Sequence, residues 1–339
     1  MVAGQASDTC QQSADVAGRL YLMTDTKQAE RERHEQQARA DTRRRRALGW
    51  AALIAVWFFW GSTYDAIRIG VRDMPPLVMA GTRYLIAAAV LLPLAARGRS
   101  PGEPSFNTLA TWRSAAVVGA LMLFGGNGLL SVGEQTLPAG VAALLVATVP
   151  LWMVAVDAGL SRRMVRPMVA AGLLLGLTGV ALLVHPSGAQ RLDPFGVVVV
   201  LLAALSWAAG SLYSRTASQP RQPFLATSMQ MLAGGLILFA AAALSGEWGH
   251  VDIGRMSWAT ALALGWLILP GSIVAFTAYI YALRTLPTST VSTYAYVNPV
   301  VAVLIGWPLL GERPTAQTAA AGAIIVAAVA LILRASARH

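Results

Sequence analysis

Ten apolar stretches follow one another along this chain of 339 residues, and they decide what kind of protein it can form. A helix needs about 20 mostly apolar residues to cross the hydrocarbon core of a bilayer. It also satisfies its backbone hydrogen bonds within one segment, as lipid requires. The sequence therefore predicts an all-α membrane protein with ten transmembrane helices, at approximately residues 48–69, 77–96, 112–132, 138–159, 168–185, 195–214, 224–244, 257–281, 288–310 and 315–333.

The composition is typical of a polytopic membrane protein. Hydrophobic residues make up 56% of the chain and charged residues 12%, against about 25% charged residues in a soluble domain. The net charge of +10 includes the run Arg43–Arg46, directly before the first apolar stretch. Such a run is typical of a cytoplasmic anchor that is attracted to anionic lipid. A lipid bilayer is therefore the expected partner, and nucleic acid is not.

The N-terminal segment, residues 1–46, contains no long apolar stretch and is predicted to be a basic, disordered cytoplasmic tail. The first apolar stretch starts too late and is too long for a cleavable signal peptide. Met23 is an alternative start, because the residues before it add no recognisable structure. The single cysteine, Cys10, lies in this tail, which argues against disulfides and cysteine metal sites.

The arginines between the spans indicate the orientation in the membrane. With a cytoplasmic N-terminus and ten spans, eleven arginines fall on the inside and five on the outside. Because cytoplasmic loops carry the excess of positive charge, both termini are expected in the cytoplasm. The inside set is Arg97, Arg99, Arg113, Arg162, Arg163, Arg166, Arg215, Arg221, Arg284, Arg334 and Arg338, and the outside set is Arg68, Arg72, Arg191, Arg255 and Arg313.

An internal repeat divides the membrane part into two halves. The motif Thr136-Leu137-Pro138 recurs 149 residues later as Thr285-Leu286-Pro287, and the same offset relates the Gly-Ser-x-Tyr motifs that start at Gly61 and Gly210. The predicted halves are residues 47–185 and 186–334, followed by a short cytoplasmic tail at 335–339. Each half holds five spans, an odd number, so the second copy is inverted in the bilayer. Inverted repeats are typical of secondary transporters, with the substrate site between the halves, although channels contain them too.

Several motifs resemble those of the drug/metabolite transporter superfamily, in particular its EamA-type exporters. They are WGSTYDAIRIGV at 60–71, PPLVMAGTRYLIAAAVLLP at 75–93, GNGLLSVGEQTLPAGVAALLVATVPLW at 126–152, LSWAAGSLYSR at 205–215 and STYAYVNPVVAVLIGWPLLGERP at 292–314. The resemblance implies a fold of two inverted five-helix repeats, export of amino acids or related small metabolites, and a bacterial inner-membrane location. Two positions depart from it: Arg163 stands at the repeat position of Glu312, and Asp65 stands where relatives are expected to have an apolar residue.

Ionisable residues within spans are costly and are usually paired or functional. Asp65 lies about eight residues before the first turn and Arg83 about nine after it, so at 1.5 Å per residue they share a depth and can meet. Either they form a fixed pair that locks the hairpin, or Arg83 or the pair faces a cavity and meets a carboxylate or a coupling proton. Glu134 is either a boundary charge or a proton site at an outer gate, and Asp157 is interpreted as a boundary residue.

Aromatic and amide side chains supply the remaining candidates for substrate contact. An interfacial belt would place aromatic residues at the span ends, whereas many of these lie inside spans, where they either pack helices or line a cavity. The candidates are Trp60, Ser62, Tyr64, Arg83, Asn127, Trp152, Trp207, Ser211, Tyr213, Tyr279, Tyr294 and Asn298, with Asp65 and Glu134 for coupling or ion pairing.

Other classes of function lack their motifs. His34, His185, His250 and His339 lie outside the spans, so no Ser-His dyad and no HExxH metal site is expected within the membrane. The chain contains no phosphate-binding GxxxxGK[ST] motif. We therefore expect no enzyme, no metal and no cofactor, but a secondary transporter that exports small metabolites by alternating access, with protons as a candidate coupling ion. A passive channel or uniporter is the alternative, and both a monomer and a homodimer remain open.

Overall fold

The computed structural model describes residues 41–97, 108–161, 167–184, 192–220, 222–286, 288–291 and 293–337. The chain divides into two units, residues 1–51 and 52–339, and the packing and the site described below concern the second unit. Several predicted features lie outside the described residues, namely most of the N-terminal tail with Cys10 and Met23, the end of the C-terminal tail, and Arg99, Arg162, Arg163, Arg166, Arg191, Arg221 and Pro287.

The described part of the chain consists of helices and short connections, and no strand occurs within it. A helix described over Asp41–Gly70 comes first. The rest of the first half contains α2 (Pro76–Arg97), α3 (Leu109–Val118), the π-helix η1 (Gly119–Gly128), α4 (Leu129–Gly133), α5 (Ala139–Val146), α6 (Val149–Ser161) and α7 (Pro167–Val184).

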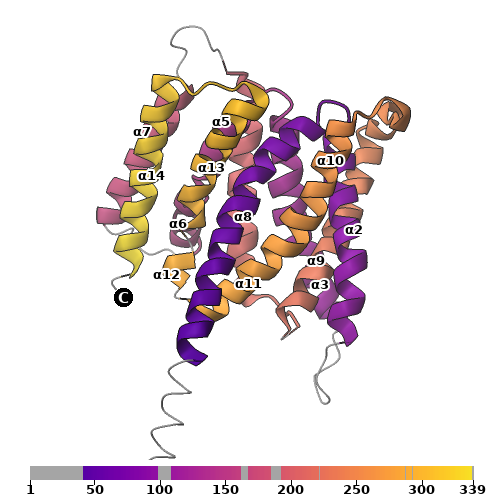
Figure 1. Ribbon diagram of the computed structural model, residues 1–339. Helices are drawn as coiled ribbons and strands as arrows, with labels where there is room; N and C mark the ends of the chain where they lie inside the picture. The colour runs from indigo at the N-terminus through magenta and orange to yellow at the C-terminus, as the bar shows by residue number, and fades with distance from the viewer. Residues whose placement is uncertain are drawn as a thin grey trace, which may run out of the picture. The chain divides into compact units, whose positions relative to one another are not determined.

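The second half follows the same order of long helices (Figure 1). It contains α8 (Pro194–Thr216), α9 (Pro223–Leu244), the short 3₁₀ helices η2 (Glu247–His250) and η3 (Ile253–Arg255), α10 (Trp258–Trp266), the π-helix η4 (Leu267–Val274), α11 (Ala275–Thr285), α12 (Thr288–Val291), α13 (Tyr294–Leu310) and α14 (Ala316–Ala337).

Seven of the described helical segments are long and apolar enough to cross a membrane. They are Asp41–Gly70, Pro76–Ala95, Leu109–Gly133, Ala139–Leu160, Pro194–Thr216, Pro223–Leu244 and Trp258–Ala282. Three shorter apolar helices complete the set, Pro167–Leu183, Val297–Leu310 and Ala316–Leu331. The prediction of an all-α membrane protein is confirmed. Helices occupy all ten predicted ranges, and in three of these ranges the apolar helix is shorter than a full span.

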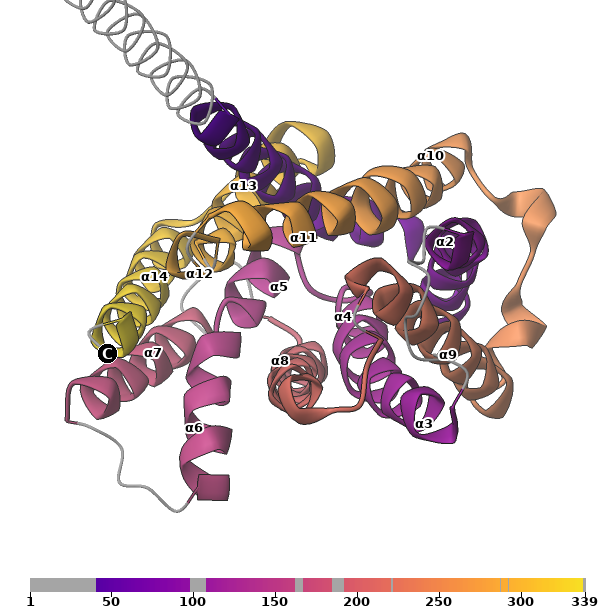
Figure 2. The ribbon, with the colours of Figure 1, turned by 90° about the horizontal axis from the view of Figure 1, so that it is seen from below.

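The packing brings the two halves of the chain together. Helix α2 packs against α9, and α7 packs against α14, as Figures 1 and 2 both show. Helix α5 contacts α13, and further contacts of α8, α9 and η4 with first-half helices also join one half to the other. In the view from below, α8 lies between α6 on one side and α3 with α4 on the other, and it contacts all three.

Each half contains a π-helix within its third long helical segment, and these π-helices free backbone carbonyls. A π-helix shifts the backbone hydrogen bonds out of the α-helical register, which is frequent at functional sites. The Leu121 carbonyl in η1 accepts a hydrogen bond from Ser206 Oγ at 2.7 Å. The Gly271 carbonyl in η4 accepts one from Trp60 Nε1 at 3.1 Å. Both bonds join helices from opposite halves of the chain, so the π-helices fix the walls between them.

Candidate functional site: a central cavity and a charged cluster

A cavity of about 450 Å³ lies among helices of both halves, within the usual range for small-molecule sites. Its wall is formed mainly by residues of the first helix, η1, α4, α5, α6, α8, η4, α11 and α13. Helices α2 and α9 contribute as well, through Arg83, Tyr84 and Met231. The cavity thus has walls from both halves of the chain.

Seven of the twelve predicted contact residues lie on the cavity wall. They are Trp60, Tyr64, Arg83, Asn127, Trp207, Tyr294 and Asn298. Among them Asn298 is buried, and its Oδ1 has no hydrogen-bond partner among the described residues. The structure therefore brings together residues that lie more than two hundred positions apart in the sequence.

Trp60 is the centre of an aromatic group on one wall. Its ring centroid lies 5.0 Å from that of Tyr279, 5.3 Å from that of Tyr294 and 6.0 Å from that of Phe276. Tilted and edge-on contacts of this kind are favourable for aromatic rings. Tyr279 is not part of the cavity wall, so it acts by supporting Trp60 and Tyr294 from behind.

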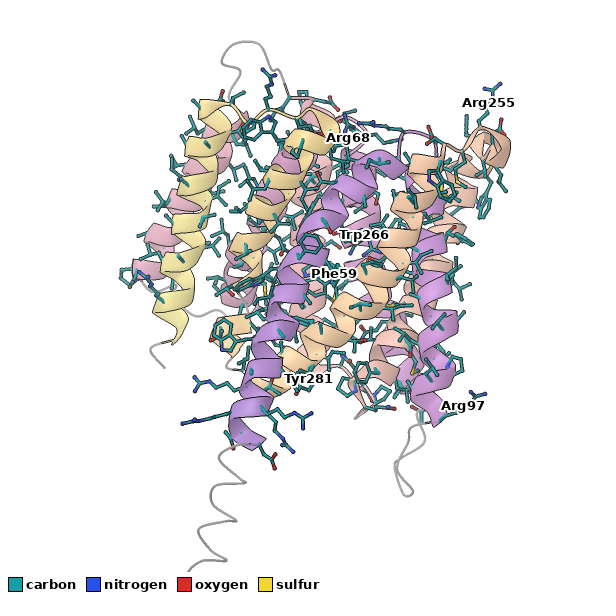
Figure 3. The ribbon with its side chains drawn as sticks, viewed as in Figure 1. Phe59, Arg68, Arg97, Arg255, Trp266 and Tyr281 are labelled. Carbon is teal, nitrogen blue, oxygen red and sulfur yellow. The ribbon has the colours of Figure 1, made fainter. Side chains whose placement is uncertain are left out.

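Ser62 does not reach the cavity either. Its hydroxyl donates to the Phe59 carbonyl at 2.9 Å and accepts from Trp266 Nε1 at 2.9 Å. Figure 3 shows Phe59 and Trp266 next to each other, and their ring centroids are 5.7 Å apart. Ser62 therefore ties the first helix to α10.

Trp152, Ser211 and Tyr213 are also absent from the cavity wall. Trp152 Nε1 donates to Thr148 Oγ1 at 3.2 Å, and Ser211 Oγ donates to the Trp207 carbonyl at 2.7 Å. Tyr213 is exposed. A serine in a helix readily bonds a carbonyl one turn back, so the hydroxyl of Ser211 is satisfied without contact to a substrate.

Arg83 is buried in the middle of α2 and faces the cavity. Its Nε donates to Ser272 Oγ at 2.7 Å, and its guanidinium carbon lies 4.8 Å from the centre of the Tyr84 ring. Of the two roles predicted for Asp65 and Arg83, the fixed ion pair is wrong, because both Asp65 oxygens lack a hydrogen-bond partner among the described residues, whereas Arg83 does face the cavity. The two residues face different neighbours, Arg83 the helix η4 and Asp65 the helix α13.

A second group of charges, which we call the charged cluster, consists of Asp65, Arg68, Glu134 and Glu312. Arg68 Nη1 donates to the Glu134 carbonyl, and Arg68 Nε lies 3.8 Å from Glu312 Oε1. Arg68 thus connects the first helix to the end of α4 and to the segment after α13. Figure 3 shows Arg68 at the upper end of the molecule, opposite Arg97.

Two carboxylates of the charged cluster are buried without partners. Glu134 and Asp65 have exposed fractions of 0% and 1%, and none of their four carboxylate oxygens has a hydrogen-bond partner among the described residues. The Asp65 carboxylate lies against Gly306, where an added Cβ would be 2.7 Å from Oδ1. Glu134 is therefore no exposed boundary charge, which was one of its two predicted roles.

The surroundings of Glu134 favour its protonated form. Burial raises the pKa of Glu134 well above its usual range, and the negative charges of Asp65 and Glu312 raise it further. Burial also raises the pKa of Glu312, although Arg68 opposes this. The charged and titratable groups that act on Glu134 or are acted on by it are Asp65, Glu312, Arg68, Arg83 and Tyr64.

A glycine turn places Glu312 in the charged cluster. Gly311 ends α13 with a φ of +72°, a left-handed conformation that suits glycine. Its N–H donates to the Trp307 carbonyl at 3.1 Å, and the Glu312 N–H donates to the Gly306 carbonyl at 3.3 Å. The bond from Gly311 to Trp307 is that of the αL motif of a helix end, and the turn places Glu312 beside Arg68.

Replacing Gly311 with alanine is expected to lower stability by about 1 kcal/mol, because the left-handed conformation strains any residue with a Cβ. Gly159 is the matched control: it lies in α6 with nothing within 4 Å of an added Cβ, so alanine there should be neutral or stabilising. Thermal unfolding of the purified protein in detergent measures both. Equal melting temperatures for the two variants would contradict the role of the turn.

Polar, charged and aromatic residues that the sequence analysis did not propose also lie on the cavity wall, among them Ser272, Phe276 and Arg215. Ser272 and Phe276 lie in or next to the second π-helix, and Arg215 lies at the end of α8. Ser272 directly follows Pro270-Gly271 within a span. A helix-breaking pair inside a span is tolerated where the backbone lines a cavity, so this pair could have indicated the site. Arg215 was assigned only a topological role, and no signal in the sequence distinguishes it from the other loop arginines.

Comparison with known proteins gives concordant matches. The family model of the EamA-like transporter family matches residues 47–185 and 194–334. The inner membrane transporter YedA of Escherichia coli (strain K12) is 39% identical over 287 residues, which cover 84% of this chain and 90% of YedA. The probable amino-acid metabolite efflux pump of Salmonella typhimurium (strain LT2) is 25% identical over 287 residues, 82% of this chain and 92% of the pump. One crystal structure superposes with a TM-score of 0.57 at 22% identity, over 87% of this chain and 98% of that chain, and supports the fold.

Proposed function

Because the chain belongs to the EamA-like transporter family and is a multi-pass transporter of the bacterial inner membrane, we propose that it exports small amphipathic metabolites, amino acids or related compounds, by alternating access. The observation that carries this proposal is the cavity of about 450 Å³ between the two halves, with a buried arginine and several aromatic rings on its wall. Transporters with inverted repeats bind their substrates in such a place, near the middle of the membrane.

Helix positions support ten helices in two inverted repeats. Shifting the starts of α3 and α7, Leu109 and Pro167, by the 149-residue offset of the sequence motifs leads to Trp258 and Ala316, where α10 and α14 start. The π-helix η1 and the π-helix η4 are likewise counterparts. The pairs α2 with α9 and α7 with α14 each join a helix to its own counterpart, and α5 with α13 joins the fourth predicted span of one half to the fourth of the other, as expected for helices near a pseudo-two-fold axis.

The described conformation is assigned as open to the cytoplasm. Arg97 and the C-terminal end lie at the same end of the molecule in Figures 1 and 3, and Arg68 and Arg255 lie at the other. The arginine distribution assigns the first end, and both termini, to the cytoplasm. The cavity wall extends to Arg215, an exposed residue at that end, whereas the opposite end is closed by Val141, Leu144 and their neighbours.

We assign the charged cluster as the closed outer gate and as the site of proton coupling. Arg68 holds the first helix to Glu134 and Glu312 across the two halves. Asp65 and Glu134 have no partner for a negative charge, so a proton on each lowers the cost of burying them. Loss of these protons favours an arrangement in which water reaches the carboxylates, and this links the protonation of the gate to its opening.

Counterflow in liposomes tests the transport function. The purified protein is reconstituted, loaded with one unlabelled compound of a panel of amino acids and small amphipathic metabolites, and offered the same labelled compound outside. Saturable uptake that depends on the internal compound is expected for at least one member. Flux that neither saturates nor responds to the internal compound would contradict a carrier and favour the passive channel.

A further inference from the structure

Arg83 puts a positive charge on the cavity wall at mid-membrane depth. It is the eighth residue of the span Pro76–Ala95, about 4 Å along the helix from the middle of that span. Its exposed fraction is 6%. A charge in this position is costly, and such residues mark substrate or ion pathways.

No acid balances this charge within the part of the chain that the structure describes. No carboxylate lies within 4.0 Å of the guanidinium, and no Asp or Glu belongs to the described cavity wall. Glu134 interacts electrostatically with Arg83, but burial raises the pKa of Glu134 well above its usual range, which favours the neutral form of this carboxyl. Arg215, the other arginine on the described cavity wall, adds a second positive charge toward the cytoplasmic end.

The hydrogen bonds of Arg83 leave donors for a ligand. Its Nε–H is used by Ser272, whereas its two Nη groups make no hydrogen bond to the described residues. An arginine carries five N–H donors in a planar fork that fits a carboxylate with two parallel bonds. The bond to Ser272 holds this fork in a fixed orientation, so that little conformational freedom is lost when a carboxylate binds.

We infer that the cavity takes organic monocarboxylates with an apolar or aromatic body and no free ammonium group. The inference rests on the proposed transport function and narrows its substrate class. The carboxylate would meet Arg83, and the body would lie against Trp60, Trp207 and Phe276. An α-ammonium group would find only neutral acceptors, such as Asn127 and Asn298, and would lose hydration without a counter-charge. Simple amino acids are therefore poorer ligands than acids or N-acylated derivatives of the same size.

Three compounds with the same phenyl body test the inference: 3-phenylpropionate, phenylalanine and 2-phenylethylamine. The first has a carboxylate only, the second adds an ammonium group, and the third has the ammonium group only. Binding to the purified, reconstituted full chain is measured by isothermal titration and by the fluorescence of its tryptophans, two of which line the cavity. We expect 3-phenylpropionate to bind at least about tenfold more tightly than phenylalanine, and 2-phenylethylamine to show no saturable binding.

The Arg83→Gln variant removes the charge but retains a donor for Ser272. It should weaken 3-phenylpropionate binding roughly 10- to 100-fold, as expected for hydrogen bonds to a charged group. Arg97→Gln is the matched control, since Arg97 is an exposed arginine at the end of the same helix and should leave binding unchanged. The ranking of the three compounds on the unaltered protein needs no variant, so it decides the question even if Arg83→Gln fails to fold.

Binding of phenylalanine or 2-phenylethylamine as tight as that of 3-phenylpropionate would overturn the inference, as would unchanged affinity in Arg83→Gln. Absence of 3-phenylpropionate binding, with counterflow of another compound, would overturn the substrate class and leave the transport function intact. Binding that depends on Arg83, without counterflow of any compound, would support the inference and remove the transport function.

Discussion

Glu134→Gln and Asp65→Asn are each expected to abolish the coupling of transport to a pH gradient while leaving substrate exchange intact. If one proton moves per substrate, a gradient of one pH unit drives about tenfold accumulation; in either variant the accumulation should fall to about onefold. The physical reason is that an amide imitates the protonated carboxyl and binds no further proton. Counterflow exchanges one substrate molecule for another and needs no net movement of protons, so it should persist in both variants.

The direction of the pH effect follows from the pKa of Glu134. Burial and neighbouring acids raise this pKa, so the described arrangement binds the proton more tightly than an exposed carboxyl does. The bound proton stabilises the described arrangement fully below the ordinary glutamate pKa of about 4.3. This stabilisation is lost as the pH rises through the raised pKa of Glu134. Low pH should therefore favour the closed outer gate, and high pH should favour its opening.

Uptake of labelled substrate into liposomes, with and without an imposed gradient, measures this coupling. Asp252→Asn is the control, because Asp252 is an exposed acid at the Arg255 end whose interactions are with Gly254 and Arg255. It should retain full coupling. Accumulation of about tenfold in Glu134→Gln and Asp65→Asn would show that the proton site lies elsewhere.

Gly119→Leu is expected to destabilise the protein by about 3 kcal/mol and to reduce the folded yield severely. A Cβ at Gly119 would lie 2.7 Å from the Gly234 backbone nitrogen and 2.9 Å from the Gln230 carbonyl oxygen. Backbone atoms cannot rotate away as a side chain can, so η1 and α9 would have to separate. Small residues permit this close helix approach in membranes, and overpacking of such contacts costs several kcal/mol at its upper end.

Gly265→Leu is the matched control for this helix contact. Gly265 also lies in a helix, α10, but an added Cβ there would meet nothing within 4 Å. Thermal unfolding and size-exclusion profiles of the two variants in detergent should differ clearly, with Gly265→Leu close to the unaltered protein. Similar melting temperatures for both would contradict the close packing of η1 on α9.

The helices could be predicted from the sequence because hydropathy reports length and depth directly. Depth, however, says nothing about the direction of a side chain around its helix. Because Asp65 and Arg83 were placed at one depth, an ion pair between them was one of the alternatives, whereas their helices turn Asp65 toward Gly306 and Arg83 toward Ser272. The direction of a helix face depends on tertiary packing, which no local pattern of residues determines.

The polar candidates also show that the sequence does not determine which way a side chain points or whether it is buried. Ser62 and Ser211 lie at equivalent positions of the repeat, yet both bond carbonyls of their own helix and avoid the cavity. Glu134 lies at the predicted end of a span, where exposure is the usual state, yet tertiary packing buries it and brings it into electrostatic contact with Asp65, Arg68 and Glu312. The π-helices were not predicted, because their residues fit an α-helix equally well.

Site-specific labelling of the two ends tests alternating access most directly. Cys10 is the only cysteine, so a Cys10→Ser background permits single cysteines at Met153, on the cavity wall, and at Val141, in the closed outer half. Labelling with a membrane-impermeant thiol reagent should reach Met153→Cys from the cytoplasmic side and spare Val141→Cys at low pH. At high pH the account predicts the reverse, with Val141→Cys reactive from outside and Met153→Cys protected. Simultaneous reactivity of both positions under one condition would contradict alternating access and indicate a continuous channel.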